Sequence, residues 1–149
     1  MGTEIFNLYL VSPLFYCQFD ESGPLGFGGA AGGGTITGPG EEKLFCYELD
    51  EAQYRSIEPD GEKLIKKLVF GGKTAGSASG EKILELPGGK YLFAQKRENL
   101  SREETLAMAV EVQQEGLWQR LEIGNRLYLR YLFEDGRMVT QIYRPYSNS

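Results

Sequence analysis

Apolar and polar residues alternate most clearly near the end of the chain. Residues 126–133 and 137–145 have the period-two pattern of half-buried strands. Between them lies Glu134-Asp135-Gly136, and an Asp-Gly pair is a strong signal for a tight turn between antiparallel strands. The pattern therefore predicts a C-terminal β-hairpin.

A strand and a helix are predicted just before this hairpin. Residues 82–86 and 90–95 read as one strand, interrupted by a Pro-Gly-Gly break. Ser101 and Glu104 form the spacing of a capping box, in which each residue satisfies a backbone N–H at the start of a helix. We expect this helix to span about residues 102–115 and to end at Gly116 or slightly beyond, so the second half reads strand–helix–strand–strand.

The first half gives a weaker pattern. Residues 4–19 predict two strand pieces, or one bulged edge strand, because a proline interrupts them. Residues 43–48 predict another strand, and residues 53–57 are a further candidate. Residues 61–69 have apolar side chains at helical spacing after a potential capping aspartate, so they predict a short helix.

Two glycine-rich segments are predicted as loops. Residues 22–40 hold nine glycines and two prolines, a composition that excludes a regular helix. The degenerate GxGxxA at 26–31 is not followed by a possible helix start, and Gly72-Lys73-Thr74 lacks the first glycine of a P-loop. We therefore predict no nucleotide site, and we place the seam between the halves at residues 71–80.

The predicted fold is α+β, with an antiparallel sheet and helices on one side, formed by residues 1–149 as a single domain. A net charge of −5 argues against direct nucleic-acid binding, and no stretch is apolar enough to span a membrane. The absence of histidine excludes Ser–His and Cys–His catalysis and histidine-based metal sites, so we expect no metal and no cofactor. Cys17 and Cys46 are expected to be free thiols in a reducing cytoplasm, and no signal peptide is predicted.

Three segments carry a resemblance to a known family. They are Leu84-Glu85-Leu86-Pro87-Gly88-Gly89-Lys90-Tyr91, Arg126-Leu127-Tyr128-Leu129-Arg130-Tyr131-Leu132 and Gln141-Ile142-Tyr143-Arg144-Pro145-Tyr146. In this order, with a helix between the first two, the second half resembles the GyrI-like, or drug-regulator effector-binding, domain.

The resemblance implies two βαββ halves related by a pseudo-twofold axis, with a groove between them that binds small, often cationic or aromatic molecules. Family members sense ligands within transcription regulators or act alone; one inhibits DNA gyrase, and some hydrolyse reactive cyclopropane compounds. Leu129 stands where the drug-binding members carry a glutamate, so a preference for cations is not implied here. The first half is degenerate, because glycine-rich sequence replaces its helix, and no helix-turn-helix is present.

Aromatic side chains are the main candidates for ligand binding, because flat apolar molecules bind between aromatic faces. On the predicted penultimate strand Leu127, Leu129 and Tyr131 share one face, which the resemblance turns toward the groove. The full set of predicted ligand-binding residues is Tyr16, Phe93, Glu111, Trp118, Leu129, Tyr131 and Tyr143. Alternatively, the aromatic residues simply fill a core.

Charged residues leave further alternatives open. Glu111 and Glu115 lie one helical turn apart, so they could supply charge to a ligand, act as acid and base, or form a solvated face. Arg130 and Arg144 could clamp an anion or be exposed partners of acidic residues. The favoured function is non-catalytic binding of a small hydrophobic or aromatic molecule, with no catalytic residues. The alternatives are a protein-interaction or inhibitor module with an acidic surface, and a hydrolase that uses Glu111 or Glu115 with Tyr131.

Overall fold

The computed structural model describes residues 4–18, 41–73, 82–98 and 100–147. Its strands are β1 (Ile5–Leu10), β2 (Leu14–Gln18), β3 (Glu42–Leu49), β4 (Ile65–Lys73), β5 (Ile83–Leu86), β6 (Gly89–Lys96), β7 (Glu122–Ile123), β8 (Arg126–Glu134) and β9 (Arg137–Ser147). The helix α1 spans Arg102–Trp118. The prediction of an α+β fold with an antiparallel sheet and a helix is confirmed.

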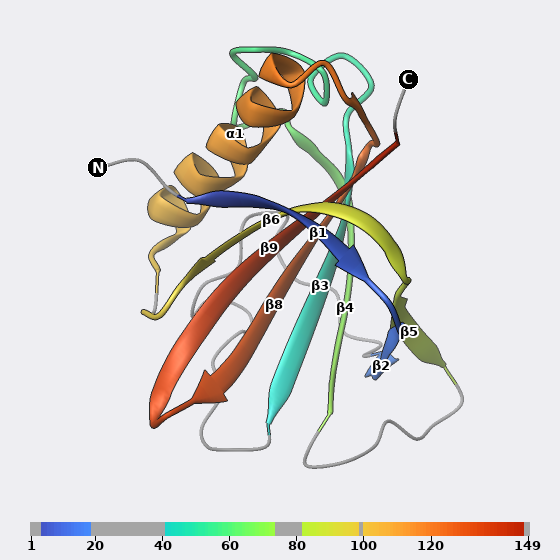
Figure 1. The fold of residues 1–149 in the computed structure, drawn as a ribbon, viewed down its shortest axis with the longest axis vertical. Helices are drawn as coiled ribbons and strands as arrows, with labels where there is room; N and C mark the ends of the chain where they lie inside the picture. Colours follow the sequence, from blue (N-terminus) through green and yellow to red (C-terminus); the bar gives the residue numbers. More distant parts are fainter. Residues whose placement is uncertain (1–3, 19–40, 74–81, 99, 148–149) are drawn as a thin grey trace.

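All strand pairs are antiparallel, in the order β1-β6-β9-β8-β3-β4-β2-β5, with β7 added beside β9. Two bent strands are each made of two consecutive segments: β1 and β2 form one, and β5 and β6 form the other. They are paired along their length, β1 with β6 and β2 with β5. At one end of this pair β6 joins β9, and at the other end β2 joins β4. In Figure 1, β1 and β6 run across the view while β9, β8, β3 and β4 fan out beneath them.

The helix begins and ends as its sequence predicts. The hydroxyl of Ser101 accepts a hydrogen bond from the Glu104 N–H at 3.1 Å, and the Glu104 carboxylate accepts one from the Ser101 N–H at 3.0 Å. This confirms the predicted capping box. Buried side chains of Met108, Ala109 and Val112 face the sheet. The helix ends at Trp118, within the expected range of Gly116 or slightly beyond.

Two elements predicted in the first half are wrong. The helix predicted at 61–69 is not formed, because residues 61–63 make a turn and residues 65–69 begin β4, where pairing with β3 satisfies the backbone groups and overrides a weak helical pattern. Asp60 nevertheless caps one turn, accepting from the Glu62 N–H at 3.1 Å. Residues 53–57 are not a strand, since the Gln53 and Tyr54 N–H groups bond back to the Asp50 carbonyl in a turn.

The strands predicted at 4–19, 43–48, 82–95 and 126–145 are confirmed. In the final hairpin Asp135 and Gly136 both have positive φ, 53° and 76°, as a tight Asp-Gly turn requires. The loop predicted at 22–40 lies outside the described residues.

Side chains alternate across the sheet and form two separate clusters. The α1-side core includes Phe45, Tyr47, Leu127, Leu129 and Tyr131 together with the inward face of α1. On the other face, between the sheet and the bent strands, lies a second group, which we call the tyrosine cluster: Tyr16, Leu44, Leu84, Leu86, Tyr91, Tyr128 and Tyr143. The fold therefore has a face covered by a helix and a face covered by the bent strands.

Candidate functional site

The face of β8 that the sequence assigned to a groove is closed. Leu129 and Tyr131 are both 0% exposed and belong to the α1-side core, where the Tyr131 ring meets Phe45 edge-to-face with centroids 5.6 Å apart. The predicted groove face was therefore the wrong one. A shift of one residue exchanges the two faces of a strand, so it is Tyr128 and Arg130 that project from β8 to the opposite side.

The tyrosine cluster brings together three of the predicted residues. Tyr16 from β2, Phe93 from β6 and Tyr143 from β9 all lie in it or against it. Tyr91 is the centre of the ring contacts, edge-to-face with Tyr128 at 6.1 Å and with Tyr143 at 5.5 Å between centroids. These rings pack mainly on one another, so in this region the aromatic residues do form a core.

A polar network stands at one end of the tyrosine cluster. The Arg130 guanidinium donates to the Glu42 carboxylate at 2.7 Å, to the Tyr16 hydroxyl at 2.9 Å and to the Gln141 side-chain oxygen at 3.1 Å. The Tyr16 hydroxyl donates in turn to Glu42 at 2.9 Å. The Arg130 and Glu42 side chains are only 15% and 20% exposed, so this ion pair is mostly desolvated and well provided with hydrogen bonds.

Burial shifts the titration of the groups on this face. Desolvation raises the pKa of Tyr16, Tyr91, Tyr128 and Tyr143 above the ordinary value, and it raises the pKa of the Cys46 thiol to about 12. At neutral pH all five groups are therefore protonated and neutral. The tyrosine hydroxyls are available as hydrogen-bond donors, and Cys46 behaves as a small apolar side chain.

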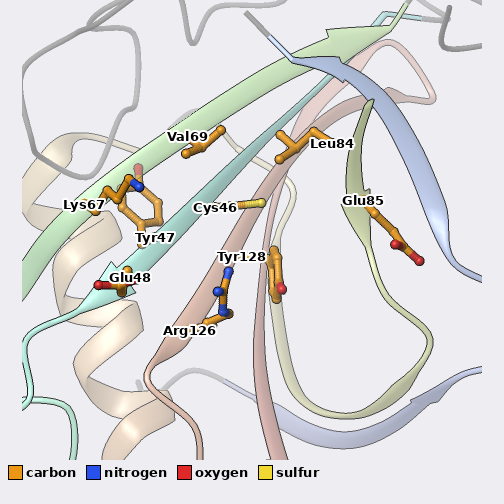
Figure 2. A pocket seen from close by; sticks show the side chains of 9 residues that line it. All are labelled: Cys46, Tyr47, Glu48, Lys67, Val69, Leu84, Glu85, Arg126 and Tyr128. Atoms are coloured by element: carbon orange, nitrogen blue, oxygen red, sulfur yellow. The ribbon is translucent and has the colours of Figure 1, made fainter. Parts of the chain in front are cut away.

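A cavity of about 220 Å³ opens at the other end of the same face. Its walls come from β3, β4, β5 and β8, as Figure 2 shows, with Cys46 and Tyr128 at the centre and Val69 and Leu84 on either side of Cys46. We call it the β3–β5 cavity. The remaining lining residues are Tyr47, Glu48, Lys67, Glu85 and Arg126.

The sequence did not point to this cavity. Cys46 and Tyr128 are direct neighbours in the β3–β8 pairing, and Cys46 pairs with Val69 on the other side. Three adjacent strands thus present small or flat side chains at one level of the sheet. The period-two pattern of residues 126–133 predicts that Tyr128 and Leu129 lie on opposite faces of the strand. Because β8 has apolar side chains on both faces, alternation alone does not predict which face is open.

Trp118 and Glu111 lie in a different place. Together with Ile5, Ile57, Gln114 and Glu115 they line an open hollow beside α1, which we call the Trp118 hollow. The indole of Trp118 is 79% exposed. The predicted ligand-binding residues therefore divide among the tyrosine cluster, the α1-side core and this hollow. The hydrolase arrangement is not formed, because Tyr131 is buried in the α1-side core while Glu111 and Glu115 line the outer hollow.

Arg130 and Arg144 do not form a clamp. Arg144 is 0% exposed on the α1 side of the sheet, where it donates to the carbonyls of Gly124 and Tyr54 and to the Gln113 side chain at 2.7–2.9 Å. Desolvation lowers the pKa of Arg144 to about 9, so it remains charged at neutral pH. The alternative expectation, that both arginines are exposed partners of acidic residues, is wrong for Arg144, which is buried and bonds to carbonyl and amide oxygens. For Arg130 the acidic partner, Glu42, is as expected, but the side chain is mostly buried.

No protein-family model and no curated protein matches the chain. Within the described residues, no three cysteine or acidic side chains are grouped so as to hold a metal ion. Among those same residues, no helix is both long and apolar enough to cross a membrane. Neither Cys17 nor Cys46 forms a disulfide.

The Arg130–Glu42 pair is expected to stabilise the fold only as a pair. Arg130→Met leaves a largely desolvated carboxylate, so the free energy of unfolding should fall by about 2 kcal/mol. Adding Glu42→Gln should recover part of that loss in urea denaturation.

The matched control is the exposed Arg97–Glu134 pair, with an N–O distance of 3.1 Å and side chains 47% and 43% exposed. In this pair Arg97→Met should change the free energy of unfolding by less than about 1 kcal/mol. Equal losses at both pairs would contradict this account.

Stability is expected to fall in alkaline solution. In the unfolded chain cysteine and tyrosine ionise near their ordinary pKa values of about 9 and 10, whereas in the folded protein the raised pKa values keep the buried groups protonated. The unfolded state therefore releases more protons, and the free energy of unfolding decreases as the pH rises above about 9.

Urea denaturation between pH 7 and pH 11 measures this dependence. Tyr128→Phe removes one buried titrating group and should make the alkaline loss less steep, while Tyr9→Phe, at a position 65% exposed, should leave the slope unchanged. The same slope for all three proteins would show that Tyr128 titrates normally.

Proposed function

We propose that the chain is a non-catalytic domain that binds a small hydrophobic or aromatic molecule in the β3–β5 cavity. The observation that carries this proposal is a partly enclosed cavity whose floor is a thiol and a phenol, Cys46 and Tyr128, backed by the packed rings of the tyrosine cluster. Small-molecule sites typically combine such an apolar floor with a few polar groups at the rim.

The size of the cavity limits what it accepts. A dry cavity of about 150 Å³ in another protein takes benzene, and drug-sized sites begin at about 300 Å³. At about 220 Å³ the β3–β5 cavity matches one aromatic ring with a substituent, or part of a two-ring system. The hydroxyl of Tyr128 and the rim charges supply the polar contacts that orient such a ligand.

The strand pairing supports a relation to the GyrI-like domain. If β1–β4 and β5–β9 are two halves, the pairing of β2 with β4 has its counterpart in that of β6 with β9. Likewise β3–β4 corresponds to β8–β9, and β3–β8 joins the halves at the centre. The second half has the strand–helix–strand–strand order, and the position of a helix in the first half falls at residues 19–40, outside the described part.

The location of the cavity fits the same proposal. Its lining residues come from β3 and β4 of the first half and from β5 and β8 of the second, so a ligand there would contact both. In the family that the second half resembles, ligands bind between the halves. On this basis the chain acts as a sensor domain, alone or as part of a transcription regulator.

The Trp118 hollow favours a second candidate function. Trp118 and Ile57 are 79% and 58% exposed beside Glu111 and Glu115, a combination of apolar and acidic surface that suits a basic protein partner. An interaction module would use this hollow, whereas a small-molecule sensor would use the β3–β5 cavity. The two functions therefore depend on different residues.

Filling the cavity separates the candidates. The probe is 2-naphthol, a neutral two-ring compound, titrated into the native chain by isothermal titration calorimetry. Val69→Phe and Leu84→Phe place a ring in the cavity from two different strands, and each should weaken binding at least tenfold while the melting temperature remains measurable.

Ile57→Phe is the matched control, because it puts the same ring into the Trp118 hollow. It should leave the binding of 2-naphthol unchanged. Weaker binding in Ile57→Phe, with no change in the two cavity variants, would move the site to the hollow and contradict the proposal.

A further inference from the structure

We infer that the ligand of the β3–β5 cavity is an aromatic carboxylate, whose ring enters the cavity and whose anionic group is held at the rim by Arg126 and Lys67. This inference rests on the proposed function and adds the charge of the ligand to it. It also reverses the preference for cations that is frequent in the family resembled by the second half.

The first observation concerns Glu42, a partly buried acid at the inner end of this face. Glu42 reaches the tyrosine cluster, but Arg130 holds its carboxylate at 2.7 Å and the Tyr16 hydroxyl adds a second hydrogen bond at 2.9 Å. A guanidinium built into the chain therefore takes the position that a cationic ligand would need. Displacing it would leave a largely desolvated charge without a partner, which is costly.

The second observation is the arrangement of charge at the rim. Arg126 on β8 and Lys67 on β4 both pair with Glu48 in the strand register, so the three side chains stand in a row across β8, β3 and β4. The nearest cation to the Glu48 carboxylate is Lys66, at 3.7 Å. The lining holds two acids, Glu48 and Glu85, and two cations, Lys67 and Arg126. Because Lys66 already offsets the charge of Glu48, Arg126 and Lys67 flank a carboxylate that has its own partner.

The third observation is that the rim cations lack acidic partners of their own. No carboxylate among the described residues lies within salt-bridge distance of Arg126 or Lys67. Glu85, the other acid of the lining, belongs to the exposed side of β5, between the inward-facing Leu84 and Leu86. In Figure 2 its carboxylate points away from Arg126, whose guanidinium extends between Glu48 and Tyr128.

Tyr128 links the rim to the floor. Arg126 and Tyr128 are two residues apart on one face of β8, and in Figure 2 the guanidinium of Arg126 lies beside the Tyr128 side chain. A carboxylate attached to a ring that lies against Cys46 and Tyr128 would come within reach of this guanidinium, and arginine binds carboxylates through two parallel hydrogen bonds. Lys67 adds a second positive charge from the opposite side of the opening.

A matched series of probes tests the charge preference. 2-Naphthoate, 2-naphthol and 2-naphthylmethylamine share one ring system and are anionic, neutral and cationic at pH 7. We expect 2-naphthoate to bind the native chain at least tenfold more tightly than 2-naphthol, and the amine to bind more weakly than 2-naphthol, in calorimetric titrations at low salt.

The double variant Lys67→Gln/Arg126→Gln removes the rim charges at exposed positions, so the fold should tolerate it. It should abolish the advantage of 2-naphthoate and leave the affinity for 2-naphthol within twofold. The matched control Arg102→Gln/Arg137→Gln removes the same net charge at exposed positions outside the cavity lining, and should preserve the advantage.

The outcomes separate this inference from the proposed function. Binding of 2-naphthol with no advantage for 2-naphthoate, or with an advantage for the amine, would overturn the charge preference and leave the binding function intact. An advantage for 2-naphthoate that survives Lys67→Gln/Arg126→Gln would overturn the assignment to these two residues. Binding of none of the three probes would overturn both.

Discussion

The pairing of β3 with β8 determines which side chains share a surface in this protein. Both strands are central, both are buried on two faces, and their register sets Cys46 beside Tyr128 and Glu48 beside Arg126. Because side chains alternate with a period of two, this register sends Leu129 and Tyr131 under α1 and sends Tyr128 and Arg130 to the opposite face. A slip of one residue would close the cavity and bury the rim charges.

The two bent strands cover only part of the sheet face opposite α1. Tyrosine rings fill the covered part, and the part between β3, β4, β5 and β8 stays open. In the covered part the charges of Arg130 and Glu42 offset each other. The open part has Cys46 and Tyr128 on its floor and both acidic and basic side chains at its rim, so the two ends of this face differ in shape.

Much of the second half could be predicted from sequence because its signals are local. The capping box at Ser101 and the Asp135-Gly136 turn fix the ends of elements through hydrogen bonds and backbone angles within a few residues. β4 could not be predicted in this way. Its first residues have a weak helical pattern, and only pairing with β3, distant in sequence, makes them a strand.

The site was missed for the same reason. Lys67 and Val69 line the cavity only because β4 is a strand. The helix predicted at 61–69 would not place these two side chains beside Cys46. The sequence does not single out Tyr128 as a cavity residue. β8 has large apolar residues on both faces, and sequence alternation cannot tell which of two apolar faces meets a helix. The aromatic residues that were chosen, Tyr16, Phe93 and Tyr143, do gather on the correct face, but they pack in its closed part.

NMR mapping with 2-naphthoate shows whether the β3–β5 cavity is the ligand site. If it is, titration of the isotope-labelled chain should give the largest chemical-shift changes at Cys46, Val69, Leu84 and Tyr128, and none at Trp118, which lies in the other hollow. The largest changes at Trp118, Glu111 and Ile57 would instead place binding beside α1 and rule out the cavity as the site.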